Sequence, residues 1–165
     1  MNEKPEKQAT LCLIVEKGKI LLAMKKRGFG VGKYNGYGGK VNEGESIEQA
    51  ALREFQEESE LKAELKDLKK VGEFDFFFPH KLEFDQTVHT FLVTNYQGEP
   101  KETEEMAFEW FDIDKIPYDK MWDDDKYWLP KVLAGKILKA KFVFTPENGE
   151  NIAKEREIKE VESLK

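Results

Sequence analysis

Three glutamates that lie close together in the sequence, Glu54, Glu57 and Glu58, are the side chains most suited to chemistry. Their spacing of i, i+3 and i+4 places them on one face of a helix. Like charges at this spacing repel, and carboxylates near a helix C-terminus also oppose the helix dipole, so a divalent cation would relieve both costs. The alternative is a solvated acidic face, which is common in a chain with 36% charged residues.

The segments around these glutamates favour a ligand site. Ser46 followed three residues later by Gln49 fits a capping box, which predicts a helix from about Ile47 to Ser59. Ala50 and Ala51 lie one turn before the glutamates, and we expect such small residues to leave room for a ligand. Six glycines in the stretch 28–39 predict a loop whose backbone closely approaches something.

The spacing around these residues follows a longer pattern: Gly39, five residues, Glu45, seven residues, Arg53-Glu54-Phe55, one residue, Glu57-Glu58, two residues, Leu61. This pattern resembles the Nudix box, a signature of hydrolases that cleave pyrophosphate bonds in nucleotides. The match departs at one position, where the family has glycine and this chain has Glu60. In the family that glycine ends the catalytic helix, so the departure concerns the helix end rather than the metal ligands.

The resemblance implies roles for the matching positions. Mg2+ or Mn2+ would be held by Glu54, Glu57, Glu58, the Gly38 carbonyl and, as a further acidic residue, Glu105. Either Glu54 or Glu57 would be the general base that activates water. Arg53 and Glu45 complete the catalytic positions, and we expect them to fix the loop against the helix by an ion pair rather than to touch substrate.

Longer segments narrow the expected substrate. Residues 24–30 (MKKRGFG), 34–41 (YNGYGGKV) and 121–128 (MWDDDKYW) are similar to the mammalian MutT-type oxidised-purine triphosphatases of the Nudix family. The similarity runs from about Thr10 to Val161. It implies hydrolysis of a free purine nucleoside triphosphate, such as 8-oxo-dGTP or 2-oxo-dATP, to monophosphate and pyrophosphate, which would sanitise the nucleotide pool.

The same resemblance implies a base pocket. Asn35 carries both a donor and an acceptor, Trp122 would stack on the purine, and one carboxyl of the pair Asp124 and Asp125 can stay protonated and donate a hydrogen bond. The full set of substrate-binding residues that it implies is Thr10, Lys25, Phe29, Asn35, Tyr37, Gly38, Gly39, Lys40, Phe76, Phe78, Trp122, Asp124, Asp125 and Trp128.

Other interpretations remain open at this point. From the residues alone, 123–125 could be a helix N-cap cluster, and the tryptophans and alternating phenylalanines could be core. Gln86 stands where the family has methionine, so the pocket floor would be more polar and base preference could differ. The substrate could instead be an unmodified dNTP or another nucleoside diphosphate derivative, or the chain could be a ligand-sensing module without catalysis.

The expected helices and strands, together with the family resemblance, predict an α+β Nudix fold. In this fold a mixed, partly split sheet is sandwiched between two helices. The second helix is expected at Trp128 to Leu138, with Pro130 in its first turn. A closing hairpin is expected at the C-terminus, although the charged segment 155–162 could also be helical. Strands are expected at 10–15, 19–24, 71–78, 86–96 and 107–112.

Length and composition set the remaining expectations. A chain of 165 residues with 39% hydrophobic content fits a single domain, 1–165, with about residues 1–8 flexible. The net charge of -6 argues against a nucleic-acid polymer as partner. The single cysteine and the lack of long apolar runs predict a cytoplasmic protein without membrane contact. We also expect a monomer.

Overall fold

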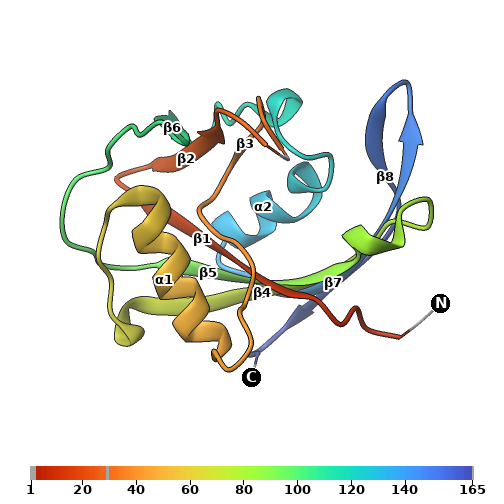
Figure 1. Ribbon diagram of the computed structural model, residues 1–165, viewed down its shortest axis with the longest axis horizontal. Coiled ribbons are helices and arrows are strands. Elements are labelled where there is room, and N and C mark those ends of the chain that lie inside the picture. The colour runs from red at the N-terminus through yellow and green to blue at the C-terminus, as the bar shows by residue number, and fades with distance from the viewer. Residues whose placement is uncertain (1–2, 29, 165) are drawn as a thin grey trace.

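The computed structural model describes residues 3–28 and 30–164, which form eight strands and two α-helices (Figure 1). The helices are α1 (Ile47–Ser59) and α2 (Asp125–Leu133). The strands are β1 (Gln8–Glu16), β2 (Lys19–Lys25), β3 (Tyr34–Asn35), β4 (Leu68–Phe77), β5 (Gln86–Val93), β6 (Met106–Asp112), β7 (Ile137–Glu147) and β8 (Glu150–Val161). Short 3-10 turns lie at Leu65–Asp67, Leu82–Phe84 and Tyr118–Lys120. No helix of the described part is long and apolar enough to cross a membrane.

The strands form one mixed sheet in the order β3-β2-β1-β5-β4-β7-β8, with β6 paired to β2. β1 is parallel to β5 and β4 is parallel to β7, whereas the other pairs are antiparallel. The first part of β1 (8–13) pairs with β5, and its last residues (14–16) pair with β2. The sheet therefore divides at β1, which agrees with the partly split sheet that the sequence predicted.

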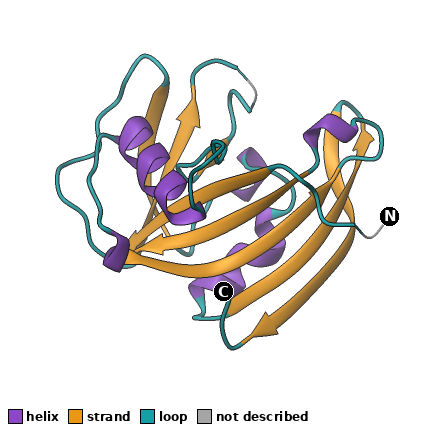
Figure 2. Ribbon diagram, turned by 60° about the horizontal axis from the view of Figure 1, so that its bottom comes forward, coloured by secondary structure: helices purple, strands orange, loops and turns teal. Residues whose placement is uncertain are grey.

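The two helices cover opposite faces of this sheet (Figures 1 and 2). Side chains of a strand alternate between faces, so Leu11 and Leu13 of β1 pack in the core with α2, whereas Cys12 and Ile14 pack in the core with α1. The expected α+β sandwich is confirmed.

The helix α1 begins and ends where the sequence predicts. Ser46 accepts a hydrogen bond from the Gln49 backbone N–H, and the Gln49 side chain accepts one from the Ser46 N–H, which completes the capping box. The helix ends because Glu60 adopts a left-handed conformation, with φ 63° and ψ 14°. A glutamate thus takes the conformation that the family's glycine adopts easily.

The prediction for the second helix was wrong at both ends. α2 starts at Asp125, so Pro130 lies inside the helix rather than in its first turn, and it ends at Leu133. Gly135 then takes a φ of 92°, and Ile137 and Leu138 enter β7. Pairing with β4 and β8 therefore overrides the apolar pattern on which the helix prediction rested. β8 confirms the closing hairpin and excludes the helical alternative for 155–162.

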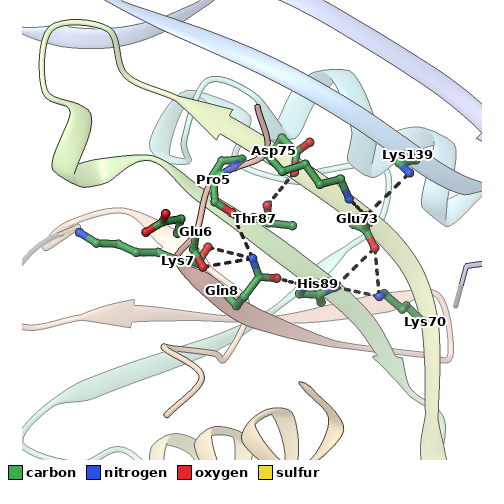
Figure 3. Close-up of polar contacts among 11 residues, drawn as sticks. Pro5, Glu6, Lys7, Gln8, Lys70, Glu73, Asp75, Thr87, His89 and Lys139 are labelled. Atoms are coloured by element: carbon green, nitrogen blue, oxygen red, sulfur yellow. Dashed lines mark hydrogen bonds and ion pairs between the residues drawn. The ribbon is translucent and has the colours of Figure 1, made fainter. Parts of the chain in front are cut away.

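The N-terminal segment, expected to be flexible, contacts the sheet from Lys4 onward. Pro5 is buried, Lys4 pairs with Glu73 at 2.6 Å, and Gln8 starts β1. Figure 3 shows this segment over a polar cluster on β4 and β5, in which His89 Nε2–H donates to Gln8 Oε1 at 2.6 Å. The His89 Nδ1 accepts from Lys70 at 2.8 Å.

Candidate active site

Two carboxylates of α1, Glu54 and Glu57, are held by the guanidinium of Arg53. Arg53 makes a two-pronged ion pair with Glu45, at 2.7 and 2.9 Å, and donates to the Lys40 carbonyl at 3.0 Å. Its Nη1 also reaches Glu54 at 2.8 Å and Glu57 at 3.1 Å. The predicted ion pair between loop and helix is confirmed. Because every nitrogen of this guanidinium is engaged by the protein, Arg53 fits a positioning role.

Glu58 is a partly buried carboxylate that faces the glycine-rich loop. Its Oε1 accepts from the Gly38 backbone N–H at 2.8 Å, which joins the glycine-rich loop to the helix. Burial raises the pKa of Glu58 to about 7, and the charge of nearby Glu54 adds to this effect. A buried carboxyl beside other carboxylates is an environment that a cation would stabilise.

The glycines of this loop are required by close approach. A Cβ on Gly38 would lie 1.8 Å from the Thr10 carbonyl oxygen, and a Cβ on Gly39 would lie 2.5 Å from the Glu54 Cδ. Any side chain at either position would push the loop away from β1 or from α1. The sequence predicted that the backbone of the glycine loop closely approaches another group. The groups that it approaches are strand β1 and helix α1 of the same protein.

A cavity of about 660 Å³ extends from this loop across the α2 face of the sheet. Its size is within the usual range for small-molecule sites. Twelve of the predicted substrate-binding residues line it: Thr10, Lys25, Asn35, Gly38, Gly39, Lys40, Phe76, Phe78, Trp122, Asp124, Asp125 and Trp128. Glu58 lines the same cavity, so the carboxylate helix and the expected base-binding residues meet in one space.

Two buried carboxyls lie at the α2 end of the cavity. The Trp128 Nε1–H donates to Asp124 Oδ2 at 2.8 Å, whereas Asp125 Oδ2 is buried without a hydrogen-bond partner among the described residues. Burial raises the pKa of Asp124 to about 6, and burial together with the Asp124 charge raises the pKa of Asp125 well above its usual value. The pair therefore offers an acceptor and a proton donor side by side.

Several cavity residues were not predicted from the sequence. Lys33 lies over the Trp122 ring, 5.8 Å from the centroid, and Phe144 stacks on Phe78 at 4.8 Å with an interplanar angle of 10°. The alternation of Phe142 and Phe144 on an expected strand was a usable signal. Other lining residues without a sequence signal include Lys7, Glu83, Phe84, Val88 and Met106; Gln86, noted as a departure, also lines the cavity.

Some predicted residues do not reach the cavity. Tyr37 is 2% exposed and packs edge-to-face on Phe55 at 6.0 Å, because the segment beside β1 turns it toward α1; its assignment to substrate is corrected. Ala50 and Ala51 are fully buried and leave no room for a ligand. Glu105 is exposed and pairs with Arg27. Phe29 lies outside the described residues.

The donor set around α1 fits a hard divalent cation. Oxygen atoms are the ligands that Mg2+ prefers, and Glu54, Glu57 and Glu58 supply carboxylates next to the loop backbone at Gly38. Within residues 3–28 and 30–164 no three acidic, histidine or cysteine side chains are already gathered at one point that could hold a metal. Arg53 instead neutralises Glu54 and Glu57.

Comparisons with known proteins agree with this geometry. The family model described as NUDIX domain matches residues 5–132. The oxidized purine nucleoside triphosphate hydrolase of Danio rerio is 49% identical over 96% of this chain and 97% of its own length. The protein of the same name from Mus musculus is 45% identical over 84% of this chain and 87% of its own length.

Solved structures show the same fold. A MutT protein from Bacillus halodurans superposes with a TM-score of 0.73 at 24% identity, covering 92% of this chain and 97% of that one. A MutT NUDIX hydrolase from Burkholderia pseudomallei has a TM-score of 0.61 at 28% identity, covering 67% of this chain and 86% of that one.

Proposed function

Because this chain belongs to the Nudix family, we propose that it is a metal-dependent hydrolase that cleaves oxidised purine nucleoside triphosphates, such as 8-oxo-dGTP or 2-oxo-dATP, to monophosphate and pyrophosphate. The observation that carries the proposal is the single cavity that joins the carboxylate face of α1, through Glu58, to the buried pair Asp124 and Asp125. The activity would remove damaged precursors from the nucleotide pool.

The α2 end of the cavity suits an oxidised purine. Oxidation of a purine adds a carbonyl and changes which ring nitrogens carry protons. A protonated Asp125 and an ionised Asp124 can adapt to such a change, because each can donate or accept according to where their shared proton lies. The aromatic rings of Trp122, Phe78 and Phe144 give the base surfaces to stack on.

The α1 end suits a triphosphate. Nudix hydrolases require divalent metal ions, and we propose Mg2+, held by Glu54, Glu57, Glu58 and the Gly38 carbonyl. When bound, this ion would neutralise phosphate oxygens and acidify water. Arg53 would hold Glu54 and Glu57 in place while either accepts a proton from the attacking water. Lys25 and Lys40, at the cavity wall, would bind phosphate oxygens.

The test is pyrophosphate release from 8-oxo-dGTP, 2-oxo-dATP, dGTP and dATP, with and without Mg2+. We expect metal-dependent turnover that favours the oxidised substrates. Preference for dGTP or dATP would identify an unmodified dNTP as substrate. Binding of nucleotides without any turnover would indicate a ligand-sensing module and would refute the proposed activity.

Matched variants separate the two ends of the cavity. Glu57→Gln should lower kcat by about 100-fold or more, whereas Glu60→Gln, an exposed glutamate on the next turn, should not. Asp125→Asn should lower the preference for oxidised over normal purines, with Asp119→Asn on the surface as the control. Asn35→Ala should change the same preference. Size-exclusion chromatography and cell fractionation test the further proposals that the protein is a cytoplasmic monomer.

A further inference from the structure

The loop that precedes α2 is tied to the C-terminal hairpin by one side chain, Asp123. Its Oδ2 accepts from the Ala153 backbone N–H of β8 at 2.9 Å, and its Oδ1 pairs with Lys126 at 2.9 Å. Only 15% of the Asp123 side chain is exposed. The next two residues on the loop are the buried carboxyls Asp124 and Asp125, so this bond lies directly beside the expected base-binding pair.

The partner of Asp123 lies at an irregularity of the hairpin. Val143 pairs with Glu155 and Phe144 pairs with Ala153, so Lys154 is an extra residue in β8, which makes a β-bulge. Both backbone groups of Ala153 are bound outside the ladder, because Arg156 Nη1 donates to its carbonyl at 2.7 Å. The Arg156 guanidinium also stacks over the Tyr127 ring of α2 at 4.0 Å.

The strand opposite this bulge forms part of the cavity wall. Phe144, the ladder partner of Ala153, stacks on Phe78 and meets Trp122 edge-on at 6.4 Å. The Ala153 junction therefore connects the loop that carries Trp122 and Asp123 to the strand pair that carries Phe144. Residues 137–161, which carry this hairpin, lie beyond the segment 5–132 that the family model matches.

Asp123 also acts on the pair electrostatically. Burial raises the pKa of Asp124, and the charge of Asp123 is among the further causes that raise it. The charge of Asp123 is in turn stabilised by Lys126, by the Ala153 N–H and by Arg156. The junction thus holds a charge at a fixed place next to the carboxyls.

On the basis of the proposed function, we propose that Asp123 is a positioning residue for base recognition, which fixes the Asp124–Asp125 pair and Trp122 by bonding to the β8 bulge. Ala153 and Arg156 complete the junction. Among the described residues, Asp123 bonds to Ala153 and Lys126 and to none of the residues proposed to hold metal or phosphate. Its loss should therefore affect binding of the base and leave the hydrolytic step intact.

The experiment compares three variants by steady-state kinetics on an oxidised and a normal purine triphosphate. Asp123→Ala should raise KM for the oxidised substrate roughly tenfold at similar kcat, because the charged hydrogen bond to the Ala153 N–H is lost and the adjacent carboxyl pair is held less firmly. Asp123→Asn keeps an oxygen that can accept from the Ala153 N–H and should restore most of that loss. Lys126→Ala, which keeps the bond to Ala153, should stay near wild type.

A direct binding measurement complements the kinetics. Quenching of tryptophan fluorescence by the oxidised monophosphate product should show the same order of affinities, with Arg156→Ala weakened in the same direction as Asp123→Ala. Kinetics of Asp123→Ala equal to those of the wild type would overturn the inference. The inference would also be overturned if Asp123→Ala raised KM equally for both substrates and Asp123→Asn did not restore it. If instead the wild type neither binds nor hydrolyses oxidised purines, the proposed function itself has failed.

Discussion

Replacing Glu60 with glycine should make this protein more stable. Glu60 ends α1 with φ 63° and ψ 14°, a left-handed conformation that costs a residue with a Cβ about 1–2 kcal/mol. Its backbone N–H donates to the Gln56 carbonyl at 2.9 Å, and glycine would keep that bond. The side chain is exposed, so its removal leaves no hole in the core.

Two smaller effects modify this gain. Glycine is more flexible in the unfolded chain, and this lowers the gain in stability by about 0.5–1 kcal/mol. Removing a negative charge from the C-terminal end of a helix adds about 0.3 kcal/mol. We therefore expect Glu60→Gly to raise the free energy of unfolding by about 1 kcal/mol, which corresponds to roughly 2–4 °C in Tm for a chain of this size.

The assay is urea unfolding of the metal-free protein at pH 7, followed by circular dichroism. Glu60→Ala is the matched control, because it removes the same charge and keeps the Cβ that disfavours this backbone conformation. Its stability should change by only a few tenths of a kcal/mol. Equal stabilities of the glycine and alanine variants would refute the argument from backbone conformation.

Three further changes test other parts of the structure. Trp128→Phe should destabilise the protein by about 1–3 kcal/mol and weaken binding of oxidised purines, because buried Asp124 Oδ2 loses its donor; unchanged unfolding and binding curves would contradict this. Gly39→Ala should reduce kcat strongly, because its Cβ would displace the Glu54 carboxylate, and wild-type turnover would show that the loop can move aside. Burial lowers the pKa of His89 to about 4 from its usual 6.5, with Lys70 adding to the shift, so the unfolded chain binds this proton more readily. Stability should fall by up to about 3 kcal/mol between pH 6.5 and 4, and His89→Gln should flatten that part of the profile; an identical slope in the variant would exclude His89 as the source.

The catalytic half of the site could be predicted from the sequence because it is built from local interactions. The capping box of Ser46 and Gln49 fixes the start of α1, and helical spacing then places Glu54, Glu57 and Glu58. The end of the helix at Glu60 was less certain, because its left-handed conformation depends on the chain that follows rather than on the residue type.

The proposed base-binding half of the cavity depends on contacts between distant segments, so less of it could be predicted from the sequence. The apolar pattern from Trp128 to Leu138 is helical, but Ile137 and Leu138 pair with other strands in the structure. The strand pairing therefore overrides the local helical pattern. Tyr37 was misplaced for a similar reason, since its direction follows from an isolated bridge to Cys12 on β1. The resemblance to a known family supplied Asn35, Asp124 and Asp125; without it, the two aspartates could equally be a helix N-cap cluster.

The charges that line the cavity are consistent with the proposed triphosphate substrate, although the net charge of the protein is -6. Four lysines line it, namely Lys7, Lys25, Lys33 and Lys40. Of the four acidic residues that line it, Asp125 has a pKa raised well above its usual value and Glu58 has a pKa of about 7, so neither carries a full charge at neutral pH. The field inside the cavity is therefore more positive than that of the molecule as a whole, and a metal ion beside Glu58 would make it more so. Burial suppresses the charge of Asp125 at the proposed base end, whereas at the proposed phosphate end a bound cation would stabilise the charged form of Glu58 against the same kind of desolvation.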